Sequence, residues 1–369
     1  MVTEQDIEYM QMAMELAANG HGFVHPNPYV GAVIVKDGRV IGKGWHTCYG
    51  KPHAEREAFA ALSESAEGAT MYVTLEPCCH YGKTPPCTEA IIEHKIARVV
   101  VGLLDPNPKV GGKGIEILKS AGIEVEYGLL ESELREQNRI FLKYITTGMP
   151  WVAMKYAMTL DGKIATHTGH SQWVSGEESR MYSQQMRNEF AAIMVGIGTV
   201  NADNPMLNCR LSGKVHHPIR IVADSQASIL LDSALVQTAK EYRTIVAHTS
   251  KANVVKLEQL QSMGVETLLC KESDAHIDVV DMLQKLGALK IDSIILEGGG
   301  TLNNSFVEAK AIDEVYSFIA PKIVGGANAK SPVEGNGVEC MSDALELQNV
   351  TVERCGNDVL VRGKVKGDR

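Results

Sequence analysis

The chain has 369 residues, which predicts two domains of about 150 residues each. Its composition, 44% hydrophobic and 22% charged, is that of a globular protein. The net charge of −9 argues against sequence-independent binding of nucleic acid, which requires a positive surface, and no apolar run is long enough to span a membrane. The eight cysteines show no disulfide framework and follow no signal peptide, so we expect reduced thiols and a cytoplasmic protein.

The first part of the chain alternates predicted helices and strands. Apolar residues recur at helical spacing after Thr3, a good N-cap, and predict a helix within residues 1–20. Asp37-Gly38 favours a type I′ turn between strands at 29–35 and 39–45. Further strands are expected at 70–75, 97–103 and 123–127, with helices at 53–62, 85–94, 114–120 and 132–144. This alternation predicts a sheet between layers of helices, an α/β fold.

The most informative motif is His53-Ala54-Glu55, which is followed by Pro77-Cys78-Cys79 and, after a polar loop, by Pro86-Cys87. One imidazole and two thiolates leave the fourth position of a tetrahedral zinc ion open for water, which is typical of a catalytic site. Bound zinc lowers the pKa of that water, and a nearby carboxylate can carry protons to a leaving amine. The sequence therefore predicts zinc ligands at His53, Cys78 and Cys87 and a proton-transferring role for Glu55.

Helix starts are expected at two of these ligands, His53 and Cys87, and helix N-termini favour thiolate over thiol. A closed structural site with Cys79 as a fourth ligand is the alternative. Adjacent cysteines rarely occupy neighbouring corners of one tetrahedron, and such a site would leave Glu55 without a role.

Together these motifs resemble the deaminase half of the bifunctional riboflavin-biosynthesis deaminase/reductase family. The resemblance covers most of the first 110 residues, through His25-Pro26-Asn27-Pro28-Tyr29, Gly42-Lys43-Gly44-Trp45-His46, His53-Ala54-Glu55 and the loop from Pro77 to Cys87. It implies a cytidine-deaminase-like three-layer domain with zinc at the three expected ligands. It also implies substrate contacts at Asn27, His46, His80 and Lys83. Cys79 departs from the family, which usually has serine there.

The helix–strand pattern breaks at Thr146-Thr147-Gly148-Met149-Pro150, so we divide the chain into residues 1–147 and 148–369. Strands are expected next at 151–158, 191–195, 218–223, 243–247 and 292–296. Glycine-rich turns follow two of them, at 196–198 and 298–300, where backbone N–H groups can approach a phosphate. A tight turn without any ligand can have the same glycine-rich sequence. None of these loops has the dinucleotide-binding fingerprint G-x-G-x-x-G.

From about Pro150 to Gly326 these segments resemble the reductase half of the same family, which implies a dihydrofolate-reductase-like domain and NADPH as hydride donor. The resemblance implies cofactor contacts at Ala157, Trp173, Thr199, Asp203, Ser225, Gly299, Gly300, Thr301, Leu302, Asn303, Asn304 and Ser305. It implies substrate contacts at Lys155, Ser171, Arg187, Leu207, Arg210 and Glu297. Guanidinium groups suit a ribose phosphate, although Arg187 and Arg210 could also be ordinary surface residues. Lys155, Asp203 and Glu297 are the candidates for the residue that orients or protonates the reacting centre of the reductase, and the sequence does not rank them.

The resemblance therefore implies two successive reactions on one small phosphoribosylated pyrimidine. The first is zinc-dependent hydrolytic deamination of 2,5-diamino-6-ribosylamino-4(3H)-pyrimidinone 5′-phosphate, and the second is NADPH-dependent reduction of its ribosyl chain to ribityl. We also expect a homo-oligomer without nucleic-acid or membrane partners. A nucleic-acid deaminase is one alternative, against which the acidic charge balance and the second domain argue. A non-catalytic regulator that binds zinc and NADPH is another, against which Glu55 argues.

Overall fold

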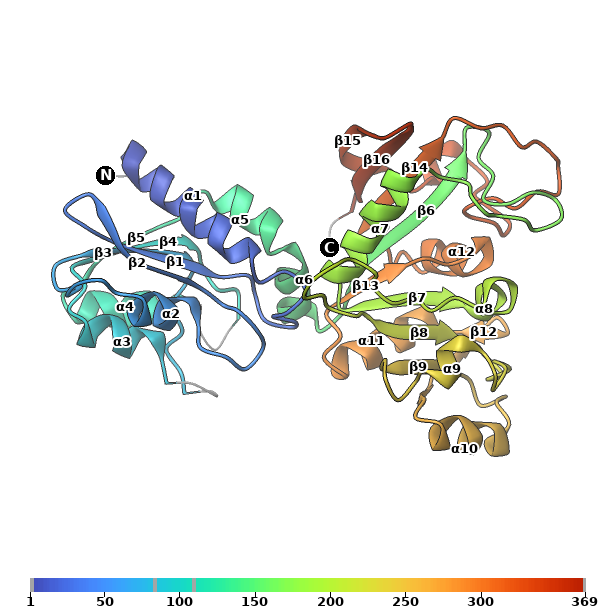
Figure 1. Ribbon diagram of the computed structural model, residues 1–369, viewed down its shortest axis with the longest axis horizontal. Helices are drawn as coiled ribbons and strands as arrows, with labels where there is room; N and C mark the ends of the chain where they lie inside the picture. The colour runs from blue at the N-terminus through green and yellow to red at the C-terminus, as the bar shows by residue number, and fades with distance from the viewer. Residues whose placement is uncertain (1–2, 82–84, 108–110, 368–369) are drawn as a thin grey trace. The chain divides into compact units, whose positions relative to one another are not determined.

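The computed structural model describes residues 3–81, 85–107 and 111–367. The chain divides into two compact units, Met1–Gly148 and Met149–Arg369 (Figure 1). Each unit has its own sheet and its own hydrophobic core. Within the described residues, no helix is long and apolar enough to cross a membrane.

The first unit contains a five-stranded sheet in the order β2-β1-β3-β4-β5. Strand β1 is antiparallel to β2 and β3, whereas β3, β4 and β5 run parallel. The elements are α1 (Glu4–Ala18), β1 (Gly31–Lys36), β2 (Arg39–Trp45), α2 (Ala54–Ala60), β3 (Thr70–Leu75), α3 (Cys87–Glu93), β4 (Arg98–Leu103), α4 (Lys113–Ser120), β5 (Glu124–Tyr127), α5 (Glu131–Gln137) and α6 (Arg139–Thr147).

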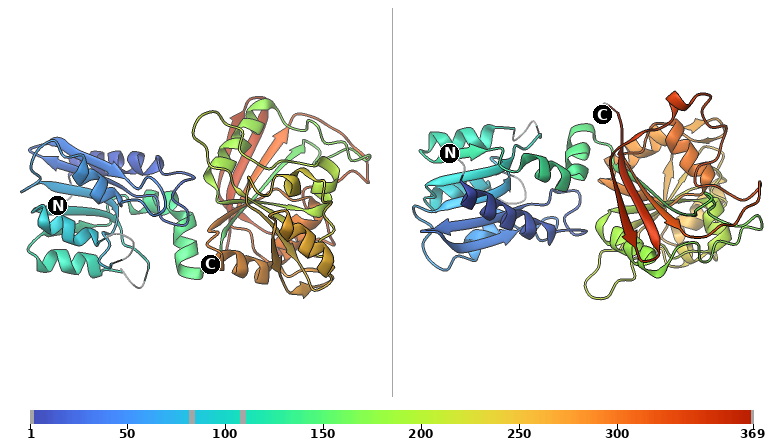
Figure 2. Two further views of the ribbon diagram at one scale, coloured as in Figure 1. Left: turned by 60° about the horizontal axis from the view of Figure 1, so that its bottom comes forward. Right: turned by 90° about the horizontal axis from the view of Figure 1, so that it is seen from above.

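Helices cover both faces of this sheet because the strand side chains alternate between two apolar layers (Figure 2). Ala32 and Ile34 belong to the core that Ala58 of α2 joins from one side. Val33, which lies between them, packs in the core that contains Met10 of α1. This is the three-layer α/β arrangement that the sequence predicted for the first half.

Local sequence signals explain several of these elements. The hydroxyl of Thr3 accepts the N–H of Asp6 in a capping box at the start of α1. Asp37 and Gly38 adopt positive φ angles of 50° and 71°, which confirms the primed turn of the β1–β2 hairpin. One prediction is wrong: the helix expected at 132–144 is two helices, separated at Asn138. The side chain of Asn138 donates to the carbonyl of Tyr29 and accepts its N–H, a distant contact that the local pattern does not reveal.

The second unit contains a nine-stranded sheet in the order β10-β9-β8-β7-β13-β6-β14-β16-β15. The strands from β10 to β14 run parallel, and β16 and β15 add an antiparallel edge. The elements are β6 (Trp151–Thr159), α7 (Glu177–Glu189), β7 (Ala192–Gly196), α8 (Ile197–Asp203), β8 (Ile219–Ala223), α9 (Ala234–Gln237), β9 (Thr244–His248), α10 (Val254–Ser262), β10 (Glu266–Leu269), β11 (Glu272–Ser273), β12 (His276–Ile277), α11 (Val279–Ala288), β13 (Ser293–Leu296), α12 (Gly300–Glu308), β14 (Glu314–Ala320), η1 (Met341–Asp343), β15 (Leu347–Cys355) and β16 (Asp358–Val365).

Both faces of the second sheet are buried, as expected for a parallel sheet. Met194 of β7 lies in one core with Met282 of α11 and Phe306 of α12. Val195, the next residue, lies in the opposite core with Leu260 of α10. The carboxyl ends of the central strands therefore meet at one edge of the sheet, where α/β proteins commonly bind ligands.

Candidate functional site

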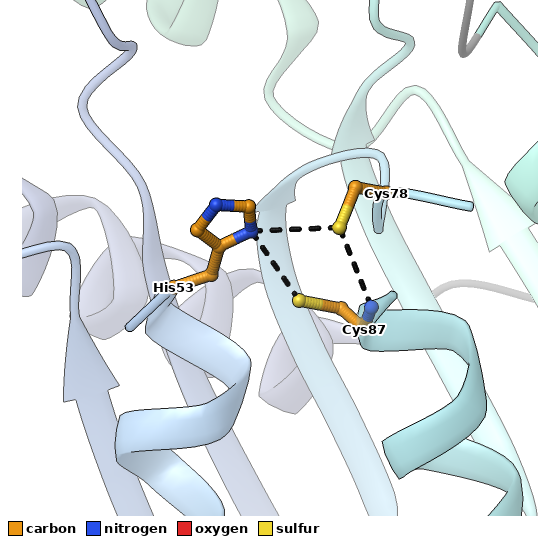
Figure 3. Close-up of side chains that lie close together, drawn as sticks. All are labelled: His53, Cys78 and Cys87. Carbon is orange, nitrogen blue, oxygen red and sulfur yellow. Dashed lines mark hydrogen bonds between the residues drawn. The ribbon is translucent and has the colours of Figure 1, made fainter. Parts of the chain in front are cut away.

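Three potential metal ligands converge in the first unit. His53 is the N-cap of α2, Cys78 follows β3, and Cys87 is the first residue of α3. The Nδ1 atom of His53 lies 3.5 Å from the Sγ of Cys78 and 3.5 Å from the Sγ of Cys87 (Figure 3). The three donor atoms all lie within 4.8 Å of one another. The structure thus brings together the three residues that the sequence singled out as ligands.

Two backbone N–H groups at the start of α3 donate to Cys78 and hold it close to Cys87. The N–H of Cys87 donates to the Sγ of Cys78 over 3.3 Å, and the N–H of Thr88 donates to the carbonyl of Cys78 over 3.2 Å. Glu76 is buried two residues before Cys78, and its carboxylate accepts the N–H of Gly112 over 2.9 Å. Sequence reasoning missed Glu76. The available signal was its place directly after an apolar strand, where a buried carboxylate needs hydrogen-bond partners.

The electrostatics of this cluster favour a bound cation. Hydrogen bonds from the Cys87 thiol and from His53 lower the pKa of Cys78 to about 4. Donation to Cys78, and then burial, raise the pKa of Cys87 well above its ordinary value. A divalent cation would stabilise both thiolates at once. One imidazole and two thiolates suit zinc, and three protein ligands leave a position for water, so the residues present fit a catalytic zinc ion.

Glu55 lies in the first turn of α2, two residues after His53, and is only 3% exposed. Burial raises the pKa of its carboxyl, although the positive charge of His53 opposes the shift. A buried carboxyl with a raised pKa can accept and release a proton near neutral pH. This position and this electrostatic environment suit a proton carrier beside a metal-bound water.

Cys79 lies beside the cluster but does not join it. The group of donor atoms found among the described residues contains His53, Cys78 and Cys87. Burial, and then the carboxylate of Glu76, raise the pKa of Cys79. The absence of Cys79 from this group of donor atoms argues against the closed structural site. All eight cysteines are free, as expected.

The residues expected to contact the deaminase substrate have different environments. The Nδ2 of Asn27 lies 3.0 Å from the Nε2 of His46, and the Nδ1 of His46 lies 3.0 Å from the carbonyl of Pro52. Since that carbonyl can only accept, the Nδ1 of His46 donates to it, and the Nε2 accepts from Asn27. This arrangement requires a neutral imidazole. Burial lowers the pKa of His46 and so favours the neutral imidazole. His46 is 3% exposed and therefore orients Asn27. His80 is exposed, and Lys83 lies outside the described residues.

The second unit contains a cavity of about 830 Å³ at the carboxyl ends of β6, β7, β8 and β13. Its size is in the range of about 300–1,000 Å³ that is usual for ligand sites. The expected reductase residues that line it are Lys155, Ala157, Ser171, Thr199, Asp203, Ser225, Glu297, Gly299, Gly300, Thr301, Leu302 and Ser305. The expected residues outside its lining are Trp173, Arg187, Leu207, Arg210, Asn303 and Asn304.

Three charged side chains meet at one end of this cavity. The Oε2 of Glu297 lies 2.8 Å from the Nη2 of Arg187, and its Oε1 lies 3.9 Å from the Nζ of Lys155. Burial alone would raise the pKa of Glu297, but Arg187 and Lys155 outweigh it and hold the pKa below its ordinary value. Burial lowers the pKa of Lys155, which Glu297 only partly offsets. Such opposed shifts in a cleft are typical of functional sites.

The segment 204–210, which carries Leu207 and Arg210, is anchored to the body of the second unit. Leu207 is buried in an apolar core, whereas Arg210 is exposed and its N–H donates to the Oε1 of Gln184 over 2.8 Å. Arg220 is fully buried and donates to the carbonyl of Met206 over 3.3 Å. Sequence reasoning missed Arg220, because an arginine within a strand is usually exposed and its partners here are distant in the sequence.

Three expected cofactor residues serve other contacts in the structure. The amide of Asn303 donates to the carbonyl of Pro332 over 2.8 Å, and that of Asn304 donates to Glu308 over 2.9 Å. Trp173 is exposed, and the guanidinium of Arg180 lies 4.7 Å from its ring centroid. The same amide also donates to the carbonyl of Gly298 over 3.3 Å, so Asn303 supports the loop after β13, whose glycines line the cavity.

Family models match both halves of the chain. The cytidine and deoxycytidylate deaminase zinc-binding region matches residues 3–103, and the RibD C-terminal domain matches residues 150–361. These matches confirm the expected folds, cytidine-deaminase-like in the first half and dihydrofolate-reductase-like in the second.

Curated relatives and solved structures resemble the whole chain. Riboflavin biosynthesis protein RibD of Actinobacillus pleuropneumoniae is 49% identical over 97% of this chain and 95% of its own length. RibD of Acinetobacter baumannii, form 1, has a TM-score of 0.89 and 37% identity, with 99% of each chain covered. The diaminohydroxyphosphoribosylaminopyrimidine deaminase/5-amino-6-(5-phosphoribosylamino)uracil reductase of Thermotoga maritima has a TM-score of 0.86 and 38% identity over 98% of this chain and 99% of its own. The chain therefore belongs to the RibD family of riboflavin-biosynthesis enzymes, which join a zinc-dependent deaminase and an NADPH-dependent reductase in one polypeptide.

Proposed function

We propose that His53, Cys78 and Cys87 hold the zinc ion of the deaminase and that Glu55 is its proton carrier. The substrate is 2,5-diamino-6-ribosylamino-4(3H)-pyrimidinone 5′-phosphate, whose C2 amine is replaced by oxygen from water. When bound, zinc supplies Lewis acidity that makes this water easier to deprotonate. Glu55 accepts one proton from the water and then delivers it to the departing nitrogen, so that ammonia leaves. The buried carboxyl with its raised pKa suits both steps.

We propose further that Asn27 contacts the base of the substrate. The buried side chain of His46 maintains the orientation of its amide. His80, which is exposed in the loop before Cys87, is our proposed contact for the ribose phosphate, and Lys83, the other expected contact, lies outside the described residues. Of these residues, His46 is a positioning residue because its two ring nitrogens already have partners.

For the second reaction we propose the cavity of the second unit. When bound, NADPH would supply the hydride that C1′ of the ring-opened ribosylamine receives in its imine form, and the imine nitrogen would take a proton. Among the ionisable groups that line the cavity, Lys155, Glu297 and Asp203 are the candidates for orienting or protonating this centre. Lys155 is the preferred acid, because burial lowers its pKa towards neutrality and thereby eases proton release.

Arg187 and Arg210 are the proposed partners of the ribose phosphate in the reductase. Neither lines the cavity, but Arg187 pairs with Glu297 over 2.8 Å, and the charge of Arg210 also lowers the pKa of Glu297. Both guanidinium groups are therefore close enough to this end of the cavity to influence a group bound there. A phosphate could draw Arg210 inward from its exposed position.

The observation that carries the proposal is the convergence of the donor atoms of His53, Cys78 and Cys87, with Glu55 buried beside them. The test is to incubate the zinc-loaded protein with the diaminopyrimidinone phosphate, with and without NADPH. Ammonia release without NADPH, and NADPH oxidation only after deamination, are the expected results. A protein that binds zinc and NADPH but releases no ammonia would be a regulator, and ammonia release from RNA or DNA would indicate a nucleic-acid deaminase.

We further propose that residues 1–147 perform the deamination and residues 148–369 the reduction. The two compact units divide at Gly148, next to this boundary, and each site lies within one unit. A cytoplasmic location and a homo-oligomeric assembly complete the proposal. Size-exclusion chromatography with light scattering tests the assembly.

A further inference from the structure

The cavity of the second unit extends across four neighbouring strands of the sheet. It is lined by residues at the carboxyl ends of β6, β13, β7 and β8, which are consecutive in the sheet. Three spacings of about 4.8 Å between neighbouring strands give a length of about 14 Å along this edge. Lys155 and Glu297 mark the β6–β13 end, and Ser225 and Gln226 mark the β8 end.

The middle of the cavity suits the pyrophosphate of the cofactor. Gly299 is the N-cap of α12 and Gly300 is its first residue, and both line the cavity beside Thr199. Unpaired N–H groups at a helix N-terminus attract phosphate. This inference rests on the proposed reductase function, which places the nicotinamide near Lys155 and Glu297. The adenosine must then lie at the β8 end.

The carboxylate of Asp224, at the β8 end of the cavity, already has hydrogen-bond partners within the protein. Asp224 directly follows β8, where enzymes specific for NAD often use an acid to accept the ribose 2′-hydroxyl. Here Asp224 is 2% exposed, and its two oxygens accept the Ser228 hydroxyl over 3.0 Å and the Ile229 N–H over 2.8 Å. It therefore supports its own loop, and its oxygens are engaged by these two donors and not by a ribose hydroxyl.

Donor groups remain available near β8, because Ile277, the neighbour of His276, packs in one core with Ile221 of β8. The hairpin β11–β12 turns at Asp274 and Ala275, whose φ angles are 47° and 65°, and brings His276 into the cavity wall. The side chains of His276 and Ser225 have no hydrogen-bond or ion-pair partner among the described residues. An imidazole donates an N–H to phosphate in either protonation state and adds positive charge when protonated.

We propose that His276 and the hydroxyl of Ser225 bind the 2′-phosphate of the cofactor's adenosine. The other lining side chains that can carry a positive charge, Lys155 and Lys330, belong to different parts of the wall. Lys155 lies on β6 beside Glu297, and Lys330 lies against the segment at Ile164 through a backbone hydrogen bond of 2.9 Å. His276 is thus the residue that makes the adenosine end selective for phosphorylated adenosine.

Calorimetric titration of the full-length protein tests this role without turnover. The probes are adenosine 2′,5′-bisphosphate and adenosine 5′-monophosphate, which differ by the 2′-phosphate. His276→Ala should weaken the bisphosphate about tenfold, the lower end for a hydrogen bond to a charged group, and leave the monophosphate unchanged. His276→Asn, which retains an N–H donor, should recover part of the loss, and Ser225→Ala should produce a smaller loss of the same selectivity.

Lys271→Ala is the matched control, because this exposed cation lies close to the hairpin but outside the cavity lining. Equal losses for Lys271→Ala and His276→Ala would show a general electrostatic effect and overturn the proposal. Equal weakening of both probes by His276→Ala would overturn it too, since it would place the imidazole on the adenosine itself. If the unmodified protein bound neither NADPH nor the bisphosphate, the reductase assignment itself would fail.

Discussion

Replacing Glu297 by glutamine tests whether one carboxylate holds two buried cations together. The carboxylate lies 2.8 Å from Arg187 and 3.9 Å from Lys155, and the three side chains are between 11% and 15% exposed. Glutamine preserves the shape but removes the negative charge. Lys155 and Arg187 would then face each other with no compensating charge between them.

The expected cost follows from this burial. Removing one partner of a buried ion pair costs about 3–5 kcal/mol, because the remaining charge is left uncompensated. Since these side chains border a cavity that water can enter, we expect the lower end, about 3 kcal/mol. Each kcal/mol lowers Tm by about 2–4 °C in a unit of 150–250 residues, so Tm of the second unit should fall by about 6–12 °C.

Differential scanning calorimetry of the full chain measures this shift. The transition that NADPH moves to higher temperature identifies the second unit, because a ligand stabilises the unit that binds it. Glu346→Gln is the control, since Glu346 pairs with Lys366 over 2.7 Å on the surface and should give no resolved shift. An unchanged or raised Tm for Glu297→Gln would refute the view that the carboxylate balances the two cations.

Three further substitutions test the individual assignments. Glu55→Gln should retain zinc but lower deaminase kcat by at least about 10²–10⁴-fold, while reduction of the deaminated substrate persists; loss of both activities in a folded protein would contradict independent sites. Cys79→Ser should leave metal content and deaminase rate nearly intact, and release of zinc would place Cys79 among the ligands. Arg210→Ala should reduce the binding free energy of the phosphorylated reductase substrate by about 1.5–3 kcal/mol with NADPH affinity unchanged, and equal losses in calorimetric titration would move Arg210 to the cofactor phosphate.

Features with local causes could be predicted from the sequence. Thr3 caps a helix because its hydroxyl reaches an N–H three residues later. Asp37-Gly38 makes a tight turn because both residues tolerate positive φ. Cys87 occupies the first turn of its helix, as the preceding prolines suggested. The last of these signals predicted the helix start at Cys87, one of the proposed metal ligands, before any long-range contact was known.

Features that depend on distant contacts could not be predicted in this way. Asn138 interrupts a helical pattern because its side chain bonds to Tyr29, more than one hundred positions earlier. Arg220 can be buried because its guanidinium donates to carbonyls and hydroxyls from several segments, including the hydroxyl of Thr244 on the next strand. The antiparallel edge β14–β16–β15 has an exposed outer strand with no strong apolar alternation. Such contacts are properties of the folded chain and not of any one window of sequence.

The most direct test of the account is the metal content of the purified protein together with the zinc anomalous signal in its crystals. We predict one zinc ion per chain, bound by Nδ1 of His53 and by the Sγ atoms of Cys78 and Cys87, with solvent as the fourth ligand. A protein without zinc after purification in zinc-containing buffer, or a zinc ion whose fourth ligand is Cys79, would contradict the account.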